Sequence, residues 1–258
     1  MNPENVVAVI RSLFERAKST DEFEYVSTLM RMRGIESAGW DTLEETNVLF
    51  SDLTGLMESP IREDTRIRLA LLLYSHLTEV EAIYLILINM IQVIDGKRYS
   101  FDPFGHLYRP RNRARISQIP PSAKSVINHL KTVALEKHEQ DVEALLNRFF
   151  NDSIRNAFFH SDYTLYGNEF RSRNGHFDLG DGTNGPSVPI GRLYDQINDG
   201  MIFYQAFMEV FVDALRSYTT DVRTTGRIHG GDERIPLTIH ADENGLRGIS
   251  SNNIGSQA

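Results

Sequence analysis

The feature of the sequence that most constrains its fold is a stretch from about Glu63 to Asp95. Its apolar side chains recur every three or four residues, and its second half is apolar nearly all round. A helix of that kind must be surrounded by other apolar surfaces. We therefore predict one long helix here, ended by Gly96, in the centre of a helical bundle. Residues 82–94, the most apolar part, are too few for a membrane span of about 20 residues, so we expect no membrane partner.

The same periodicity predicts that most of the remaining chain is helical. We expect helices at about 3–18, 22–33, 41–58, 122–138, 140–160 and 189–218. The period changes after residue 160, where two short segments flank Gly167 and Asn168, a pair typical of a β-hairpin turn. Residues 174–187 have the composition of a loop.

These patterns predict a mostly α protein with three parts. They are an N-terminal helical extension at 1–60, a helical domain at 61–220 and a polar, flexible C-terminal tail at 221–258, in which a short strand is expected at 235–239. The expected architecture is an antiparallel helical bundle with additional N-terminal helices and a small β-hairpin.

The composition excludes several classes of chemistry. The 258 residues contain no cysteine, which excludes disulfides, a thiol nucleophile, iron–sulfur clusters and cysteine-based zinc sites. No phosphate-binding glycine loop is present, and no two of the eight histidines are three or four residues apart. We expect neither a metal nor another cofactor. The missing cysteines and the lack of a signal-peptide pattern are typical of a cytoplasmic protein.

A proline-broken stretch at 97–121 is strongly basic, although the whole chain has a net charge of −8. It holds six basic residues and one acid, Asp102. Clustered arginines bind phosphates, so RNA or phosphate contacts are expected at Arg109, Arg111, Arg113 and Arg115. The alternative is an ordinary solvated loop.

The candidate catalytic residues are Arg155, Asn156 and His160, at the end of a predicted helix. An arginine followed directly by a polar residue, with a histidine after four intervening residues, resembles the signature of the HEPN family. The run that follows, 161–171, is similar to a group of bacterial HEPN-like proteins. The resemblance covers about 140–173 and extends to the long helix at 63–95.

This resemblance implies a small all-α bundle that forms a homodimer. Many HEPN proteins are metal-independent endoribonucleases in toxin–antitoxin, abortive-infection and other phage-defence systems. Others are inactive or bind nucleotides. The expected function is accordingly RNA cleavage without metal, with RNA as substrate and an antitoxin or regulatory protein as a further partner.

The residue types suit this reaction. RNA supplies its own 2′-hydroxyl nucleophile, and the products would carry a 2′,3′-cyclic phosphate and a 5′-hydroxyl. His160 would transfer protons, Arg155 would stabilise the phosphorane, and Asn156 would position one of them. His76 and Glu79, three apart on the long helix, are expected behind these residues in a second layer.

Helical geometry complicates that assignment. At about 100° per residue, Asn156 and His160 lie about 40° apart, whereas Arg155 lies about 140° from His160. The two groups meet only if the helix ends or bends before His160, if the arginine reaches round, or if a second subunit supplies one of them.

Each residue also has a structural interpretation. His160 would be a buried histidine bonded to a carbonyl, Arg155 an arginine that is solvated or paired with Asp152 or Asp162, and Asn156 a helix cap. His76 and Glu79 would be a buried polar pair that sets helix register. The corresponding alternative function is a non-catalytic module that binds a nucleotide, RNA or a partner protein. A third possibility is a helical interaction protein in which the motif arises by chance.

Overall fold

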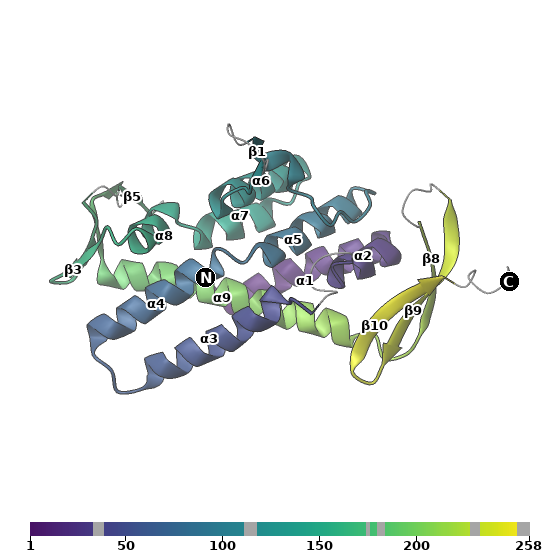
Figure 1. The fold of residues 1–258 in the computed structure, drawn as a ribbon, viewed down its shortest axis with the longest axis horizontal. Helices are drawn as coiled ribbons and strands as arrows, with labels where there is room; N and C mark the ends of the chain where they lie inside the picture. The colour runs from purple at the N-terminus through teal and green to yellow at the C-terminus, as the bar shows by residue number, and fades with distance from the viewer. Residues whose placement is uncertain (33–38, 111–117, 174–175, 180–183, 228–232, 252–258) are drawn as a thin grey trace.

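The computed structural model describes residues 1–32, 39–110, 118–173, 176–179, 184–227 and 233–251. Most of these residues are helical, as predicted, and the helices lie side by side along one long axis (Figure 1). Helix α9 (Ile190–Arg216) extends over most of this axis, since its 27 residues span about 40 Å. It connects the two ends of the molecule.

The central apolar stretch forms two helices, so the prediction of one continuous helix is wrong. Helix α4 (Glu63–Leu77) and helix α5 (Glu81–Ile94) are bent by 41° at the break between them. Buried side chains explain the break: the Thr78 hydroxyl donates to the Ser75 carbonyl at 2.8 Å, and the Tyr84 hydroxyl donates to the Thr78 carbonyl at 3.1 Å. Helix α5 is buried nearly all round, as the sequence predicts.

The N-terminal helices belong to the same core. Helix α1 (Pro3–Thr20) packs on α9 and α5, and its buried stripe includes Ile10, Leu13 and Phe14. Helix α3 (Thr42–Glu58) packs on α4 and begins at Asp41, whose carboxylate accepts the Leu43 N–H at 2.9 Å. The core therefore continues across residue 60, where we expected an extension to end.

Helix α2 (Glu22–Leu29) is shorter than the predicted 22–33. Arg31 has a φ of 46°, in the left-handed region that a helix cannot continue through. Gly34, the expected end of this helix, lies outside the described residues.

A second predicted helix is also broken in two. Residues 140–160 form α7 (Gln140–Phe149) and α8 (Asp152–Phe159), with Asn151 extended between them as the cap of α8. The hydroxyl of Tyr74 from α4 occupies this break. It accepts the Asn151 N–H at 2.8 Å and donates to the Phe149 carbonyl at 2.9 Å. Helix α6 (Ala123–Glu136) packs on α7 and α5.

The predicted hairpin is confirmed: β3 (Thr164–Tyr166) and β4 (Glu169–Arg171) are antiparallel and turn at Gly167, which has a φ of 59°. The expected loop at 174–187 holds strands, contrary to prediction. Strand β7 (Ser187–Pro189) pairs with β4, and β5 (Phe177–Asp178) pairs with β6 (Asn184–Gly185).

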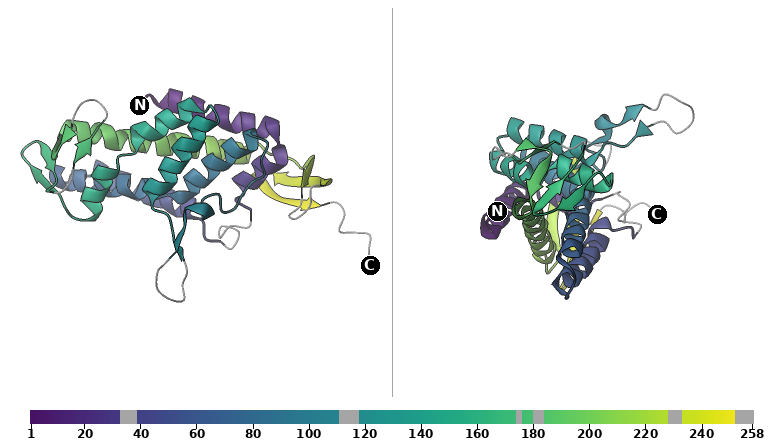
Figure 2. Two further views of the ribbon diagram at one scale, coloured as in Figure 1. Left: turned by 90° about the horizontal axis from the view of Figure 1, so that it is seen from above. Right: turned by 90° about the vertical axis from the view of Figure 1, so that its left-hand side faces the viewer.

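In the basic stretch, a 3-10 turn at Gly105–Leu107 precedes the short strands β1 (Arg109–Pro110) and β2 (Gln118–Ile119). The two strands pair and project from the helical body (Figure 2).

The predicted flexible tail is wrong for residues 222–251, which form a three-stranded antiparallel sheet at one end of the molecule (Figure 1). Its order is β10-β9-β8, with β8 at Val222–Arg227, β9 at Arg234–Asp242 and β10 at Gly245–Ser251. The expected strand at 235–239 is part of β9. The sheet buries Leu237 and Ile239 against the helices. Two buried apolar residues in a polar segment give too weak a hydrophobic pattern to predict a sheet from the sequence. Residues 252–258 lie outside the described part.

Candidate functional site

The predicted catalytic residues lie on α8, where it packs on α4. Arg155 and Asn156 belong to the helix, and His160 follows its last residue as the C-cap. The buried side chains of Ile154 and Ala157 hold α8 in place. The motif therefore lies at a helix end, as predicted.

Arg155 is enclosed by the protein's own groups. Its guanidinium forms an ion pair with Glu79, donates to Asn156 Oδ1 at 2.9 Å and lies 3.6 Å from Asp152 Oδ1. It also lies 5.4 Å from the ring centroid of Phe159, and its side chain is only 16% exposed. The salt-bridge interpretation of Arg155 is thus correct, with Glu79 as the main partner in addition to Asp152.

His160 has a different environment. Its side chain is exposed, so it is not the buried histidine of the structural interpretation. Among the described residues, no hydrogen bond or ion pair engages its imidazole, and neither kind of bond joins it to Arg155. Asn156 is not a helix cap, because its side-chain oxygen accepts from Arg155.

His76 and Glu79, which were expected together behind the motif, contact different parts of the protein. Glu79 binds Arg155, whereas the half-buried His76 turns to α3, where its Nε2 lies 3.2 Å from the Thr46 hydroxyl. Burial lowers the pKa of His76, and the nearby Glu79 carboxylate opposes that shift. Glu79 therefore lies beside the motif and His76 belongs to the α3–α4 contact.

The basic residues at 109–115 cannot be assigned to the same site. Arg109 is exposed on β1, in the projecting pair of strands. Arg111, Arg113 and Arg115 lie outside the described residues, so their expected RNA contacts stay predictions.

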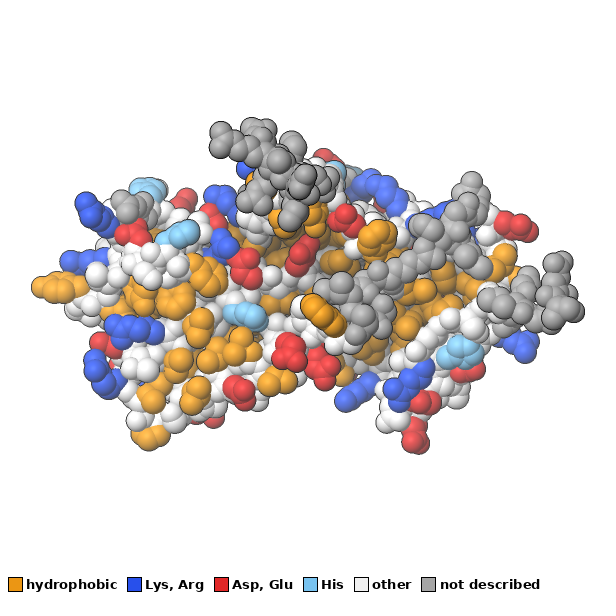
Figure 3. All heavy atoms as spheres, viewed as in Figure 1, with side chains coloured by type: hydrophobic (Ala, Val, Ile, Leu, Met, Phe, Trp, Pro, Cys, Tyr) orange, Lys and Arg blue, Asp and Glu red, His pale blue; other side chains and the backbone are white. Residues whose placement is uncertain are grey.

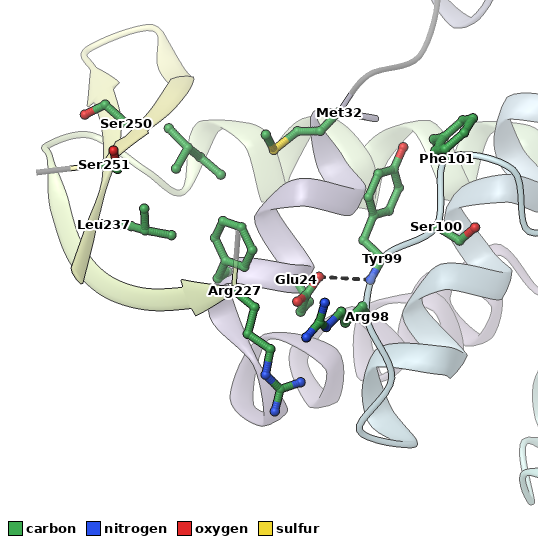
Figure 4. A pocket seen from close by; sticks show the side chains of 12 residues that line it. Glu24, Met32, Arg98, Tyr99, Ser100, Phe101, Arg227, Leu237, Ser250 and Ser251 are labelled. Atoms are coloured by element: carbon green, nitrogen blue, oxygen red, sulfur yellow. Dashed lines mark hydrogen bonds between the residues drawn. The ribbon is translucent and has the colours of Figure 1, made fainter. Parts of the chain in front are cut away.

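A second candidate site lies near the other end of the long axis. A cavity of about 390 Å³ opens between α2, residues 98–101 and the C-terminal sheet (Figure 4). Glu24 of α2 lines it, is 5% exposed, and accepts the Tyr99 N–H at 2.9 Å through Oε2. Burial raises the pKa of Glu24, whereas the Tyr99 N–H and the positive charges of Arg98 and Arg227 act in the opposite direction.

Sequence reasoning missed this cavity because its walls come from three separated segments. One local signal was available. Glu24 lies between Phe23 and Tyr25 in a helix of which seven of eight residues are buried, and a carboxylate in such a run requires a partner.

The described residues contain no group of three or more histidine, aspartate or glutamate side chains arranged to hold a metal ion. Within the same residues, no single helix is both long and apolar enough to cross a membrane, and only the bent pair α4–α5 meets that test.

Comparison of the chain with protein-family models, with curated proteins and with solved structures found no match. The resemblance to HEPN proteins therefore rests on the Arg155–His160 spacing and the residues that follow it.

Proposed function

We propose that this chain is a non-catalytic HEPN-like helical module that binds a ligand or a partner and does not cleave RNA. The observation that carries the proposal is the ion pair between Arg155 and Glu79. A catalytic arginine must offer its guanidinium to phosphate oxygens, and here the protein's own carboxylate occupies that position.

The surrounding charge supports the same conclusion. Glu79 and Glu81 line one small hollow beside Tyr84, and Asp152 lies on the other side of Arg155. Against these three carboxylates stand two cations, Arg155 and Lys124, the latter 2.9 Å from Asp152. Burial and the nearby Asp102 carboxylate raise the pKa of Glu81, as expected where negative charges gather. A phosphate entering here would meet repulsion from these carboxylates, and a guanidinium whose terminal nitrogens already face Glu79, Asn156 and Asp152.

Cleavage of a labelled mixed-sequence RNA in EDTA tests the proposal, with wild type beside His160→Ala. We expect no cleavage by either protein. Cleavage by wild type that is lost in His160→Ala would contradict the proposal and establish a metal-independent nuclease. Equal cleavage by both would indicate a contaminant or a different site.

The second candidate is the metal-independent endoribonuclease itself, acting as a toxin or phage-defence effector. One observation favours it: His160 is exposed at the end of α8, so its imidazole can reach a bound RNA and act in proton transfer. A nuclease toxin would suppress growth on overexpression, and His160→Ala would restore growth. A binding module would be tolerated with or without that change.

A partner surface is part of either function. Figure 3 shows apolar side chains gathered over the α3–α4 hairpin and α8, and the exposed ones include Val48, Leu56, Leu72 and Phe159. Contiguous exposed apolar residues of this kind mark interaction surfaces. We propose that two copies of the chain form a homodimer through this face. An antitoxin or regulatory protein is the alternative partner for the same surface. We also propose that the protein is cytoplasmic. Sedimentation of wild type and Leu56→Asp tests the homodimer. A dimer held by this face should dissociate in the variant, and a dimer that persists in Leu56→Asp would contradict the proposal.

A further inference from the structure

The cavity at the α2 end contains a carboxylate that the protein leaves half satisfied. Glu24 Oε2 accepts the Tyr99 N–H, and among the described residues no donor reaches Oε1. A buried carboxylate normally accepts several hydrogen bonds, because each one offsets part of the cost of removing it from water. The free oxygen can therefore accept N–H groups from a ligand.

A cation lies in the same cavity without a bonded partner. Arg227, from the last position of β8, has a buried Nε with no hydrogen bond, and its guanidinium donates none to the described residues. It is close enough to Glu24 to influence that carboxylate electrostatically, yet the two are not bonded. Figure 4 shows the guanidinium groups of Arg98 and Arg227 on the same side of Glu24. Arg227 therefore brings to the cavity a positive charge that can bind an anionic group of a ligand.

The remaining walls are mostly apolar, with Ser100, Ser250 and Ser251 as their polar members. Phe23 and Tyr99 supply aromatic rings, and Met32 and Leu237 supply aliphatic surface. Strand β8 packs directly on Phe23, since a Cβ added to Gly226 would overlap the ring. The volume of about 390 Å³ matches that of sites for small ligands. Aromatic walls of this kind stack on nucleobases.

We propose that this cavity binds a guanine nucleotide, with its base donating to Glu24 and its phosphate bound by Arg227. Guanine presents two adjacent donors, N1–H and the 2-amino group, which match the two oxygens of a carboxylate. Adenine and cytosine place a ring-nitrogen acceptor beside their amino group, and that lone pair would face the carboxylate. The ligand is therefore expected to be a guanine mononucleotide. The inference names a ligand for the binding module proposed above, but it depends on neither Arg155 nor His160.

Isothermal titration of the full chain with GMP tests the base contact. We expect binding by wild type and a loss of affinity of about tenfold or more in Glu24→Gln, because an amide cannot accept both donors. Glu15→Gln, an exposed residue of α1, is the matched control and should bind as wild type does. AMP should bind at least about tenfold more weakly than GMP. Equal binding of AMP and GMP, or equal binding by Glu24→Gln and wild type, would overturn the proposal.

Titration with guanosine tests the phosphate contact. Arg227→Met should weaken GMP binding to about the affinity of guanosine and leave guanosine binding unchanged, since only the phosphate contact is lost. Circular dichroism of each variant confirms that it is folded. No heat from GMP at millimolar concentration, with the wild-type protein folded, would overturn the proposal. That result would leave the RNA-cleavage test of the non-catalytic function unaffected, so the two can fail separately.

Discussion

The two ends of the molecule treat buried charge in opposite ways. At the α8 end, the terminal nitrogens of Arg155 face Glu79, Asn156 and Asp152, although its buried Nε bonds none of the described residues. At the α2 end, Glu24 and Arg227 share a cavity without bonding to each other. A charge whose partners are all internal serves to hold elements together, whereas a buried charge left with unused hydrogen-bonding capacity marks a place for a ligand. The motif that attracts attention in the sequence is therefore the better satisfied of the two sites.

The largest expected effect concerns the break between α7 and α8, which places the motif. Tyr74→Ala should destabilise the protein by about 4 kcal/mol, because a fully buried ring is replaced by a cavity. Tyr74→Phe should cost about 2 kcal/mol, since the Asn151 N–H loses its acceptor while the Phe149 carbonyl keeps Gln196. Urea unfolding measures both free energies. Equal losses in the two variants would show that the hydroxyl contributes all of the effect.

A pair of arginine substitutions tests the comparison directly. Arg155→Met should destabilise by about 2 kcal/mol, because Glu79 loses its partner but can still reach water. Arg227→Met should change the free energy of unfolding by no more than about 0.5 kcal/mol, because no bond is lost. Urea unfolding measures both free energies. Comparable losses of stability in the two variants would show that Arg155 and Arg227 are equally engaged by the protein, and the two ends would not differ.

A smaller effect is expected where the C-terminal sheet meets the helices. Gly226→Ala should cost about 1–2 kcal/mol, because the added methyl group must displace the packed Phe23 ring or the strand itself. Gly248→Ala, on the same sheet with open space around its Cβ position, is the control and should cost less. Thermal unfolding compares them. If the two variants had the same midpoint temperature of unfolding, the close contact between β8 and α2 would not be present in solution.

The smallest effect is a pH dependence arising from Glu24. Its pKa is raised in the folded protein, chiefly by burial, so folding favours the protonated carboxyl. The resulting penalty is absent below the unfolded pKa of about 4.3, grows as the pH rises toward the folded pKa, and is constant above it. Glu24→Gln should therefore be slightly more stable than wild type at pH 7, and the difference should vanish near pH 4. A difference that increased toward pH 4 would contradict the direction of the shift.

Several elements of the fold were predictable because their signal is local. The apolar periodicity of α1 and α9, the acidic cap of α3 and the Gly167 turn all depend on residues close in sequence. The two helix breaks were not predictable, because their cause is the contact between distant residues: Tyr74 reaches the α7–α8 break across more than 70 positions. The C-terminal sheet was missed because its strands bury few apolar residues.

The sequence by itself determined that the chain is mostly helical, that α5 is central, and that Arg155, Asn156 and His160 lie at a helix end. The tertiary structure decided which charges are neutralised. Hydrophobic periodicity depends on spacing along the chain and is therefore written in the sequence, whereas an ion pair depends on distance in space. Glu79 pairs with Arg155 because the end of α4 packs on α8, whereas Glu24 and Arg227 share a cavity, without a bond, because the last strands return to α2.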